Sequence, residues 1–163
     1  MSATAHAKTA PFLEEHAHFV EHLEHARVAA RELPALSIEE RELVIARIVT
    51  FLRSELVPHA EAEEHTIYRE VGKRLGNPWA TAPMIFDHLL IRRRMHALEA
   101  ADLADVDTLR EHLIALHALV CSHFEKEEQL YLPLLDVDSE EAVHEIYDRL
   151  ISYEHAHGRP YLR

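Results

Sequence analysis

Two segments of this chain place a histidine and a glutamate four residues apart: His59 with Glu63, and His123 with Glu127. On an α-helix such residues project the same way, one turn apart. Neutral imidazole and carboxylate groups presented together are ligands for a metal cation. The spacing alone decides nothing, because a chain with 15 histidines contains about two such pairs by chance.

Both pairs continue an apolar stripe of helical periodicity, in which steps of three and four residues visit almost only apolar side chains. In the segment 38–75 the stripe contains Ile45, Val49, Leu52, Leu56, His59, Glu63 and Ile67. In the segment 108–132 and the residues that follow it, the stripe contains Leu109, Leu113, Leu116, Val120, His123, Glu127, Leu130 and Leu134. The two pairs are therefore predicted to face the core of a helix bundle.

Two further segments each add one histidine to such a stripe. His16 lies among Phe12, Phe19, Leu23, Ala26, Ala30 and Leu33, and His88 lies among Met84, Ile91, Met95 and Leu98. No lysine or arginine occupies the stripes of 38–75 and 108–132, so ionised glutamates there would be very costly to bury without a compensating charge. Metal cations would satisfy the glutamates and the neutral imidazoles together. A neutral buried hydrogen-bond network is the less favoured alternative.

These six side chains offer four nitrogens and two carboxylates: His16, His59, Glu63, His88, His123 and Glu127. If both carboxylates bridge, the six side chains make about eight bonds to two metal ions. Two five- or six-coordinate ions have about ten to twelve coordination positions in all. Some positions would then remain for a solvent bridge and an outside ligand. The chain has one cysteine, and the lack of thiolates disfavours a closed structural zinc site. Mixed imidazole and carboxylate ligation suits iron best, and manganese or zinc also fit.

Helical periodicity runs through the chain, and no stretch alternates strictly with the period of two that β-strands show. Ser37 with Glu40, and Thr108 with Glu111, match the capping pattern that opens a helix. Pro58 falls inside a long helical segment and should kink it. The periodicity and its breaks predict helices near residues 10–32, 38–75, 82–102, 108–132 and 139–157.

Short links between these segments make sequence neighbours antiparallel. The predicted fold is all-α: an up-down-up-down four-helix bundle over about residues 10–135, with an additional C-terminal helix over about 139–157. Because the chain has 163 residues, we expect residues 1–163 to form a single domain.

The composition narrows the range of partners and locations. The formal net charge is −12, so nucleic acid and an acidic membrane surface would be repelled. No apolar run approaches the roughly 20 residues needed to span a bilayer, and no secretory signal is visible. Since Cys121 is the single cysteine, an intrachain disulfide is excluded. A reducing cytoplasm is therefore the expected location.

The order of the candidate ligands resembles the haemerythrin-like, or HHE cation-binding, domain family. The resemblance rests on His16, then His59-Ala-Glu-Ala-Glu63, then His88, then His123-Phe-Glu-Lys-Glu127, and it covers about residues 10–135. It implies a four-helix bundle holding a non-haem di-iron centre, with two iron ions joined by an oxo or hydroxo bridge. The resemblance also implies that the same six side chains are the ligands, with Glu63 and Glu127 as bridges.

The chain departs from the oxygen-carrying haemerythrins at two places. Those proteins have a second histidine one turn away on the third helix, where Met84 and Arg92 flank His88 in this chain. Their fourth helix carries His-x-x-x-x-Asp, whereas this one carries His-x-x-x-Glu. Reversible oxygen carriage is therefore not the expected role.

The resemblance implies handling of iron, oxygen, nitric oxide or peroxide, so the expected function is binding or sensing of oxygen, nitric oxide or a peroxide-type molecule. The sequence leaves the oligomeric state open. A di-iron redox enzyme that decomposes peroxide or reduces nitric oxide is one alternative, and iron storage or donation is another. No stripe residue besides the ligands is an evident proton donor, which favours binding over turnover.

A ferritin-like di-iron bundle, which uses Glu-x-x-His on two helices, is the structural rival. The matching strings are Glu15-His-Ala-His18, Glu141-Ala-Val-His144 and Glu154-His-Ala-His157. None of them leads into the stripes of 38–75 and 108–132, so this rival is rejected.

Several residues near the motifs could serve the centre, although each has a simpler interpretation. Tyr68 and Tyr131 could hydrogen-bond a ligand, but packing at the edge of the core is the commoner fate of such tyrosines. Arg92 is expected on a solvated face, close enough to approach an open metal position. His155 and His157 could add a ligand, but a solvated helix end is the favoured interpretation.

Overall fold

The computed structural model describes residues 8–157, and every element of regular structure in that range is helical. The α-helices are α1 (Ala10–Glu32), α2 (Ile38–Phe51), α3 (Val57–His65), α4 (Ile67–Arg74), α5 (Ala82–Glu99), α6 (Val106–Lys126), α7 (Leu132–Leu135) and α8 (Glu140–His157). Two π-helical turns, Leu52–Leu56 and Glu127–Tyr131, and one 3-10 turn, Leu33–Ala35, adjoin them. The predicted all-α class is confirmed.

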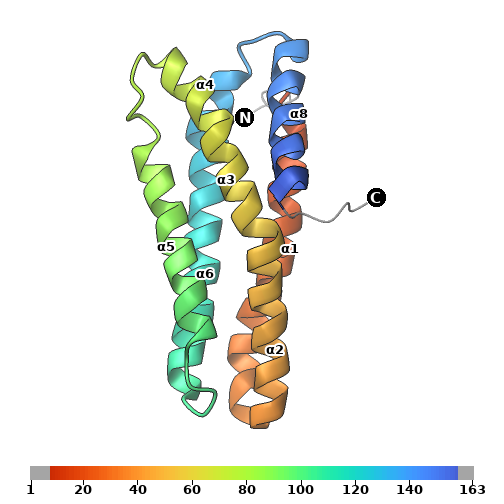
Figure 1. Ribbon diagram of the computed structural model, residues 1–163, viewed down its shortest axis with the longest axis vertical. Helices are drawn as coiled ribbons and strands as arrows, with labels where there is room; N and C mark the ends of the chain where they lie inside the picture. The colour runs from red at the N-terminus through yellow and green to blue at the C-terminus, as the bar shows by residue number, and fades with distance from the viewer. Residues whose placement is uncertain (1–7, 158–163) are drawn as a thin grey trace.

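Four antiparallel rods make the bundle (Figure 1). The first rod is α1, the second is α2 with α3 and α4, the third is α5, and the fourth is α6 with α7. The additional helix α8 packs on α3 at one end of the bundle. Among the described helices, none combines the length and the apolar character that crossing a membrane requires. The rods follow the up-down-up-down order that short links predict.

Local capping chemistry sets where two of the rods begin. Ser37 and Glu40 form the predicted capping box, in which Glu40 Oε2 accepts from the Ser37 N–H at 2.8 Å. The prediction that Thr108 caps α6 is wrong. The helix begins at Val106, because the Asp105 carboxylate accepts from the Thr108 N–H at 3.1 Å. A carboxylate is favoured at this end by the helix dipole.

A π turn comes just before the proline in each of the two segmented rods. The N–H of the residue before Pro58 donates to Leu52 O, and that of the residue before Pro133 donates to Glu127 O, across five residues rather than four. Proline inside a helix lacks a donor and clashes with the carbonyl four residues earlier. The wider π turn relieves that crowding, so it is the local feature that accommodates Pro58.

The second π turn shifts the inward stripe along the chain. The sequence predicts Leu130 on this stripe, but its side chain is 61% exposed. A π turn holds one residue more than an α turn, so the buried positions that follow are Leu132 and Leu135. The prediction for Leu130 is therefore wrong, and Leu134 is only half-buried.

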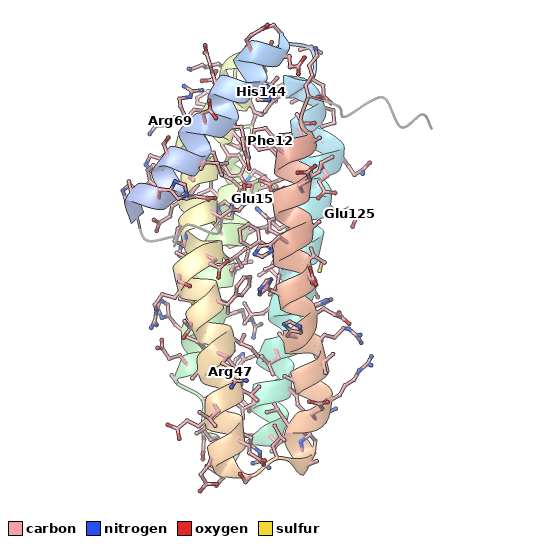
Figure 2. All side chains as sticks on the ribbon, turned by 90° about the vertical axis from the view of Figure 1, so that its right-hand side faces the viewer. Phe12, Glu15, Arg47, Arg69, Glu125 and His144 are labelled. Carbon is pink, nitrogen blue, oxygen red and sulfur yellow. The ribbon has the colours of Figure 1, made fainter. Side chains whose placement is uncertain are left out.

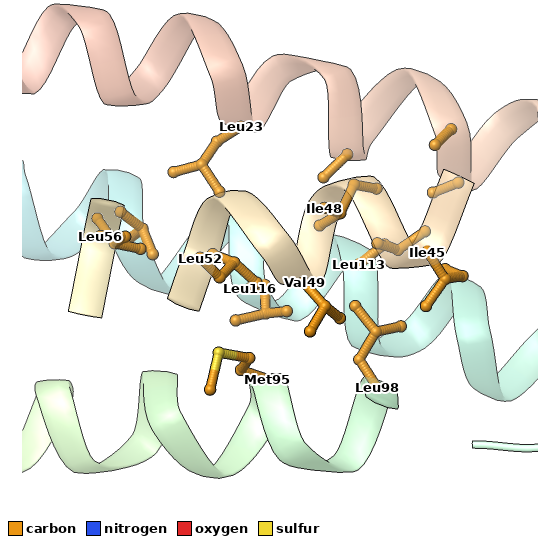
Figure 3. Packing of buried hydrophobic residues seen from close by; sticks show 14 of the residues in the cluster. Leu23, Ile45, Ile48, Val49, Leu52, Leu56, Met95, Leu98, Leu113 and Leu116 are labelled. Carbon is orange, nitrogen blue, oxygen red and sulfur yellow. The ribbon is translucent and has the colours of Figure 1, made fainter. Parts of the chain in front are cut away.

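Two apolar clusters fill the bundle on either side of a buried polar layer. The lower core lies between α1, α2, α5 and α6 and includes Leu23, Ile45, Ile48, Val49, Leu52, Leu56, Met95, Leu98, Leu113 and Leu116 (Figure 3). The upper core includes Phe12, Ile67, Val71, Met84, Leu132, Leu135, Val143, Ile146 and Leu150. Burying a large aliphatic side chain contributes about 1.5–3 kcal/mol, so apolar packing holds the rods together both above and below the polar side chains.

Candidate metal centre

The six candidate ligands lie together in one buried layer across the bundle, named here the polar layer. It consists of His16 on α1, His59 and Glu63 on α3, His88 on α5, His123 on α6, and Glu127 at the start of the second π turn. Each of these residues is at most 1% exposed. Every rod thus contributes one histidine to the same level of the bundle.

Glu63 stands between two pairs of histidines. Its Oε1 is 3.0 Å from His59 Nε2 and 3.6 Å from His16 Nε2. Its Oε2 is 3.3 Å from His88 Nε2 and 3.9 Å from His123 Nε2. The polar layer therefore divides into a His16–His59 pair and a His88–His123 pair, each facing one oxygen of the same carboxylate.

Glu127 spans the same gap from another rod. Its Oε2 is 3.4 Å from His16 Nε2, and its Oε1 is 3.6 Å from His123 Nε2. In the described part of the chain, potential ligand atoms lie within 4.8 Å of one another in the group Glu63, His88, His123 and Glu127 and in the group His16, His59 and Glu63. Each of the two carboxylates therefore lies where it could link the two groups.

All four histidines turn Nε2 toward the polar layer and Nδ1 toward an outer carboxylate. The outer pairs are His59–Glu154 at 2.8 Å, His88–Glu64 at 2.9 Å, His16–Glu128 at 3.1 Å and His123–Asp87 at 3.4 Å. A carboxylate that accepts from Nδ1–H fixes the tautomer and leaves the Nε2 lone pair facing inward. Histidines that ligate metals have this arrangement.

The inward atoms lack the hydrogen bonds that would satisfy them. Within the described residues, Nε2 of His16 and of His59, both oxygens of Glu63, and Oε2 of Glu127 have no hydrogen-bond partner. A buried polar atom without a partner costs about 1–3 kcal/mol. Cations held between these atoms would satisfy them, so the donor set fits a metal centre.

The closest nitrogen contact in the layer supports the same conclusion. The Nε2 atoms of His88 and His123 are 2.9 Å apart. When both Nδ1 atoms carry the proton, this distance sets two lone pairs against each other. A shared cation, or a proton on one ring, removes that conflict.

Protons must balance the buried carboxylates wherever no cation does so. Burial lowers the pKa of His59, but the charge of Glu63 and the hydrogen bond to Glu154 outweigh it and raise that pKa to about 10. Burial is likewise outweighed by Glu63 and Glu64 at His88, whose pKa rises to about 9. At Glu63 the positive charge of His59 outweighs burial and holds the pKa well below its usual range. A metal would compete with protons for these nitrogens.

Tyr68 is part of the upper core, and its hydroxyl reaches the polar layer. Its side chain is buried, and its hydroxyl donates to Glu127 Oε1. The hydroxyl oxygen also lies 3.2 Å from His88 Nε2 and 3.3 Å from His123 Nε2. Burial and the nearby carboxylates raise the pKa of Tyr68 well above its usual value, so it keeps its proton. A proton donor from outside the stripes therefore contacts the layer.

A helix break at Thr66 explains why the position of Tyr68 differs from the prediction. Thr66 has φ −120° and ψ −84°, and its hydroxyl donates to Ala62 O at 2.6 Å. Such a side-chain bond to the carbonyl four residues back competes with regular helix. The break separates α3 from α4 and changes the direction in which Tyr68 points. The threonine is the one local signal of this break in the sequence.

The additional helix α8 places a glutamate, and not one of the histidines considered from the sequence, beside the metal centre. Glu154 is fully buried and bonds His59. His157 is exposed, and its Nδ1 lies 2.7 Å from Tyr153 O. Neither His155 nor His157 belongs to the groups of potential metal-ligating side chains found among the described residues.

Arg92 and Tyr131 lie outside the polar layer. Arg92 Nη1 is 3.5 Å from Glu64 Oε1, so this guanidinium reaches His88 only through Glu64. The Tyr131 hydroxyl donates to Ala80 O at 3.2 Å. Tyr131 thus supports the segment before α5 and does not face the histidines.

Comparison with known proteins identifies one family. The model of the Hemerythrin HHE cation binding domain matches residues 8–135. This match covers the four rods and the whole polar layer, and it ends before α8. No curated protein and no solved structure matches the chain.

Proposed function

Because this chain belongs to the Hemerythrin HHE cation-binding domain family, we propose that its polar layer holds two iron ions and that the loaded protein binds or senses oxygen, nitric oxide or a peroxide. One observation carries the proposal. Glu63 and Glu127 each direct one oxygen toward the His16–His59 pair and the other toward the His88–His123 pair. A single cation in one pair would leave the other oxygen of each carboxylate without a partner, whereas two cations would use both oxygens.

The donor types favour iron among the metals that fit. Imidazole and carboxylate ligands also suit manganese and zinc. Bound iron would supply one-electron chemistry and coordination positions that no protein atom fills. The chain's own residues hold and orient it: the outer carboxylates fix the imidazoles, and Tyr68 presents a hydrogen-bond donor beside His88 and His123.

A pocket of about 490 Å³ between α4 and the start of α5 supports access for a small ligand. Its lining includes Tyr68 and Glu64, both of which contact His88 in the polar layer. Apolar groups such as Pro78 and Ile85 also line it. Arg69 and Lys73 line the pocket as well, but most of its exposed surface is apolar, which suits a weakly polar diatomic molecule. We therefore place ligand access on the His88–His123 side.

A di-iron redox enzyme is the second candidate, because Tyr68 provides a proton donor at the centre. A positioned acid typically contributes about 10²–10⁴-fold to a rate. Burial and the charges of Glu127 and Glu63 raise the pKa of Tyr68, so this hydroxyl is a weak acid near neutral pH. We therefore favour binding or sensing, with only slow turnover of peroxide.

Iron analysis combined with an optical spectrum of the anaerobically purified protein tests the proposal. We expect two iron ions per chain and a clear absorption change when the reduced protein meets oxygen or nitric oxide. Rapid multiple turnover of peroxide or nitric oxide, abolished by Glu63→Ala, would make the protein an enzyme instead. Two irons with no optical response to any of the three molecules would favour storage. One iron or fewer per chain after reconstitution would contradict the di-iron centre itself.

A further inference from the structure

A third group of buried potential ligands lies on the outer side of His59. It comprises Glu15 on α1, His59 itself and Glu154 on α8. His59 Nδ1 is 2.8 Å from Glu154 Oε1 and 3.8 Å from Glu15 Oε2. Both carboxylates are buried, Glu154 completely. Figure 2 shows Glu15 close to Phe12 on α1, at the level of the bundle that α8 covers.

The outer carboxylates of the other three histidines are less well shielded from water. The side chains of Glu64, Asp87 and Glu128 are 22%, 13% and 33% exposed. A carboxylate buried in a low dielectric acts more strongly on the imidazole that it bonds, and such outer partners tune metal affinity. His59 therefore has the strongest outer support of the four.

We propose that Glu154, together with Glu15, positions His59 and strengthens it as a ligand, so that the His16–His59 position holds its metal ion more tightly than the His88–His123 position. This inference rests on the proposed function, in which the polar layer holds two ions. The family match ends at residue 135, and α8 begins at Glu140. Glu154 is thus a contribution to the centre from outside the matched domain.

The packing of α8 allows Glu154 to act in this way. Leu150, one turn before Glu154, is fully buried in the upper core with Val143 and Ile146. The helix packs mainly on α3, which carries His59. A side chain held on a rigid, anchored helix can fix the orientation of an imidazole, as a mobile tail could not.

Titration of the metal-free protein with cobalt(II) tests the proposal, because the optical bands of bound cobalt report each position. The wild type should take up two ions in two steps, the tighter one first. Glu154→Gln keeps the size and an acceptor oxygen but removes the charge, and it should weaken the first step about 10–100-fold while leaving the second unchanged. Glu64→Gln is the matched control, because it removes the corresponding charge at His88 and should weaken the second step instead.

A second comparison separates positioning from packing. Leu150→Ala keeps Glu154 but opens a cavity in the upper core, so it should lower the midpoint of thermal unfolding and weaken the first cobalt step less than Glu154→Gln does. Glu154→Gln should weaken that step strongly, and it should lower the midpoint of the metal-free protein less than Leu150→Ala does. If Leu150→Ala weakens the first step as much as Glu154→Gln does, Glu154 merely anchors α8 and the proposal is overturned.

The remaining outcomes distinguish this inference from the proposed function. Equal weakening of both steps by Glu154→Gln, or of neither, overturns the role of Glu154 while two-ion binding stands. A third cobalt ion in the wild type that is lost in Glu154→Gln would make Glu15, His59 and Glu154 a metal site of their own, which also overturns it. A wild type that takes up no cobalt overturns the two-ion centre together with this inference.

Discussion

The lower core and the polar layer occupy the same bundle interior, on the same helical stripes, yet different forces stabilise them. In the lower core, Leu113 and Leu116 are fully buried among apolar neighbours and leave no polar atom to satisfy. In the polar layer, buried atoms of His16, Glu63 and Glu127 have no hydrogen-bond partner within the described part of the chain. Apolar burial stabilises the fold whatever the protein binds, whereas the layer gains stability from a ligand that the folded state binds and the unfolded chain does not.

The two apolar cores allow a small bundle to hold an unfavourable set of charges. The upper and lower cores close around the polar layer from both ends, so the layer is organised before it binds anything. A preorganised set of ligands binds more tightly than one that must be ordered at the moment of binding. The apolar clusters thus stabilise the fold, and the polar layer provides the side chains that could bind metal.

The largest expected effect comes from removing a carboxylate that faces both histidine pairs. Glu127→Ala should lower the metal content from two ions to at most one per chain, because imidazoles arranged around cations lose a shared negative charge. The variant should also lose most of the thermal stabilisation that metal gives the wild type. Metal analysis and calorimetric unfolding, each with and without a chelator, measure both effects. Full metal content with full stabilisation would remove Glu127 from the centre.

The lower core should respond to mutation without regard to metal. Leu116→Ala should lower the free energy of unfolding by about 2–5 kcal/mol, through lost burial and the cavity that remains. The loss should be the same in the metal-free and the metal-loaded protein, measured by urea denaturation. Leu130→Ala is the control, because this exposed leucine should change stability by less than about 0.5 kcal/mol. A Leu116→Ala effect that appears only with metal bound would break the separation between the two regions.

The metal-free polar layer should titrate, whereas the lower core has nothing to titrate. His59 and His88 have pKa values of about 10 and about 9 in the folded chain, above the unfolded value of about 6.5. A raised folded pKa contributes stability that is fully present below pH ~6.5 and is lost as pH rises through the folded pKa. The free energy of unfolding of the metal-free protein should therefore fall between about pH 6.5 and 10.

Metal affinity should change in the opposite direction over the same range. It should rise with pH, because fewer protons compete for the imidazoles. At the acid end, stability should fall as pH drops below about 4.5 toward the lowered pKa of Glu63, whose charge then disappears. Denaturant titrations of the chelated and loaded protein at several pH values measure these trends. Metal-free stability that rises from pH 7 to 9 would show that these imidazoles are not protonated in the folded chain.

The smallest expected effect concerns access to the layer rather than its composition. Ile85→Trp should fill part of the pocket between α4 and α5 and slow nitric oxide binding by about tenfold, equivalent to about 1.4 kcal/mol in the barrier. Metal content and stability should stay unchanged. Phe86→Trp is the matched control, because Phe86 is exposed and is not among the residues lining that pocket. Stopped-flow absorbance measures the rate, and equal rates in the two variants would place access elsewhere.

Sequence periodicity predicts most of the fold and brings the six candidate ligands into one layer. It succeeds because each of His16, His59, His88 and His123 sits between apolar neighbours at the same height of its rod. Local signals of this kind depend only on the spacing of residues along a regular helix. The capping box of Ser37 and Glu40 is also predictable from the sequence, because its two residues are three positions apart.

The features that periodicity misses arise from irregular or tertiary structure. Leu130 moves off the stripe because a π turn precedes Pro133, and Tyr68 turns inward because the helix breaks at Thr66. Glu154 reaches His59 only because α8 folds back onto α3. The direction of that return is set by packing in the upper core, and no spacing within α8 encodes it.

The claim that Glu63 and Glu127 bridge two iron ions is tested most directly by Mössbauer spectroscopy of the protein reconstituted with isotopically enriched iron. Two high-spin ferric ions joined by bridging ligands couple to a diamagnetic ground state. We therefore predict two irons per chain whose oxidised spectrum consists of quadrupole doublets without magnetic splitting at low temperature, and an oxidised protein that is silent in electron paramagnetic resonance. One iron per chain, or two ferric ions that behave as magnetically isolated centres, would contradict the bridged site.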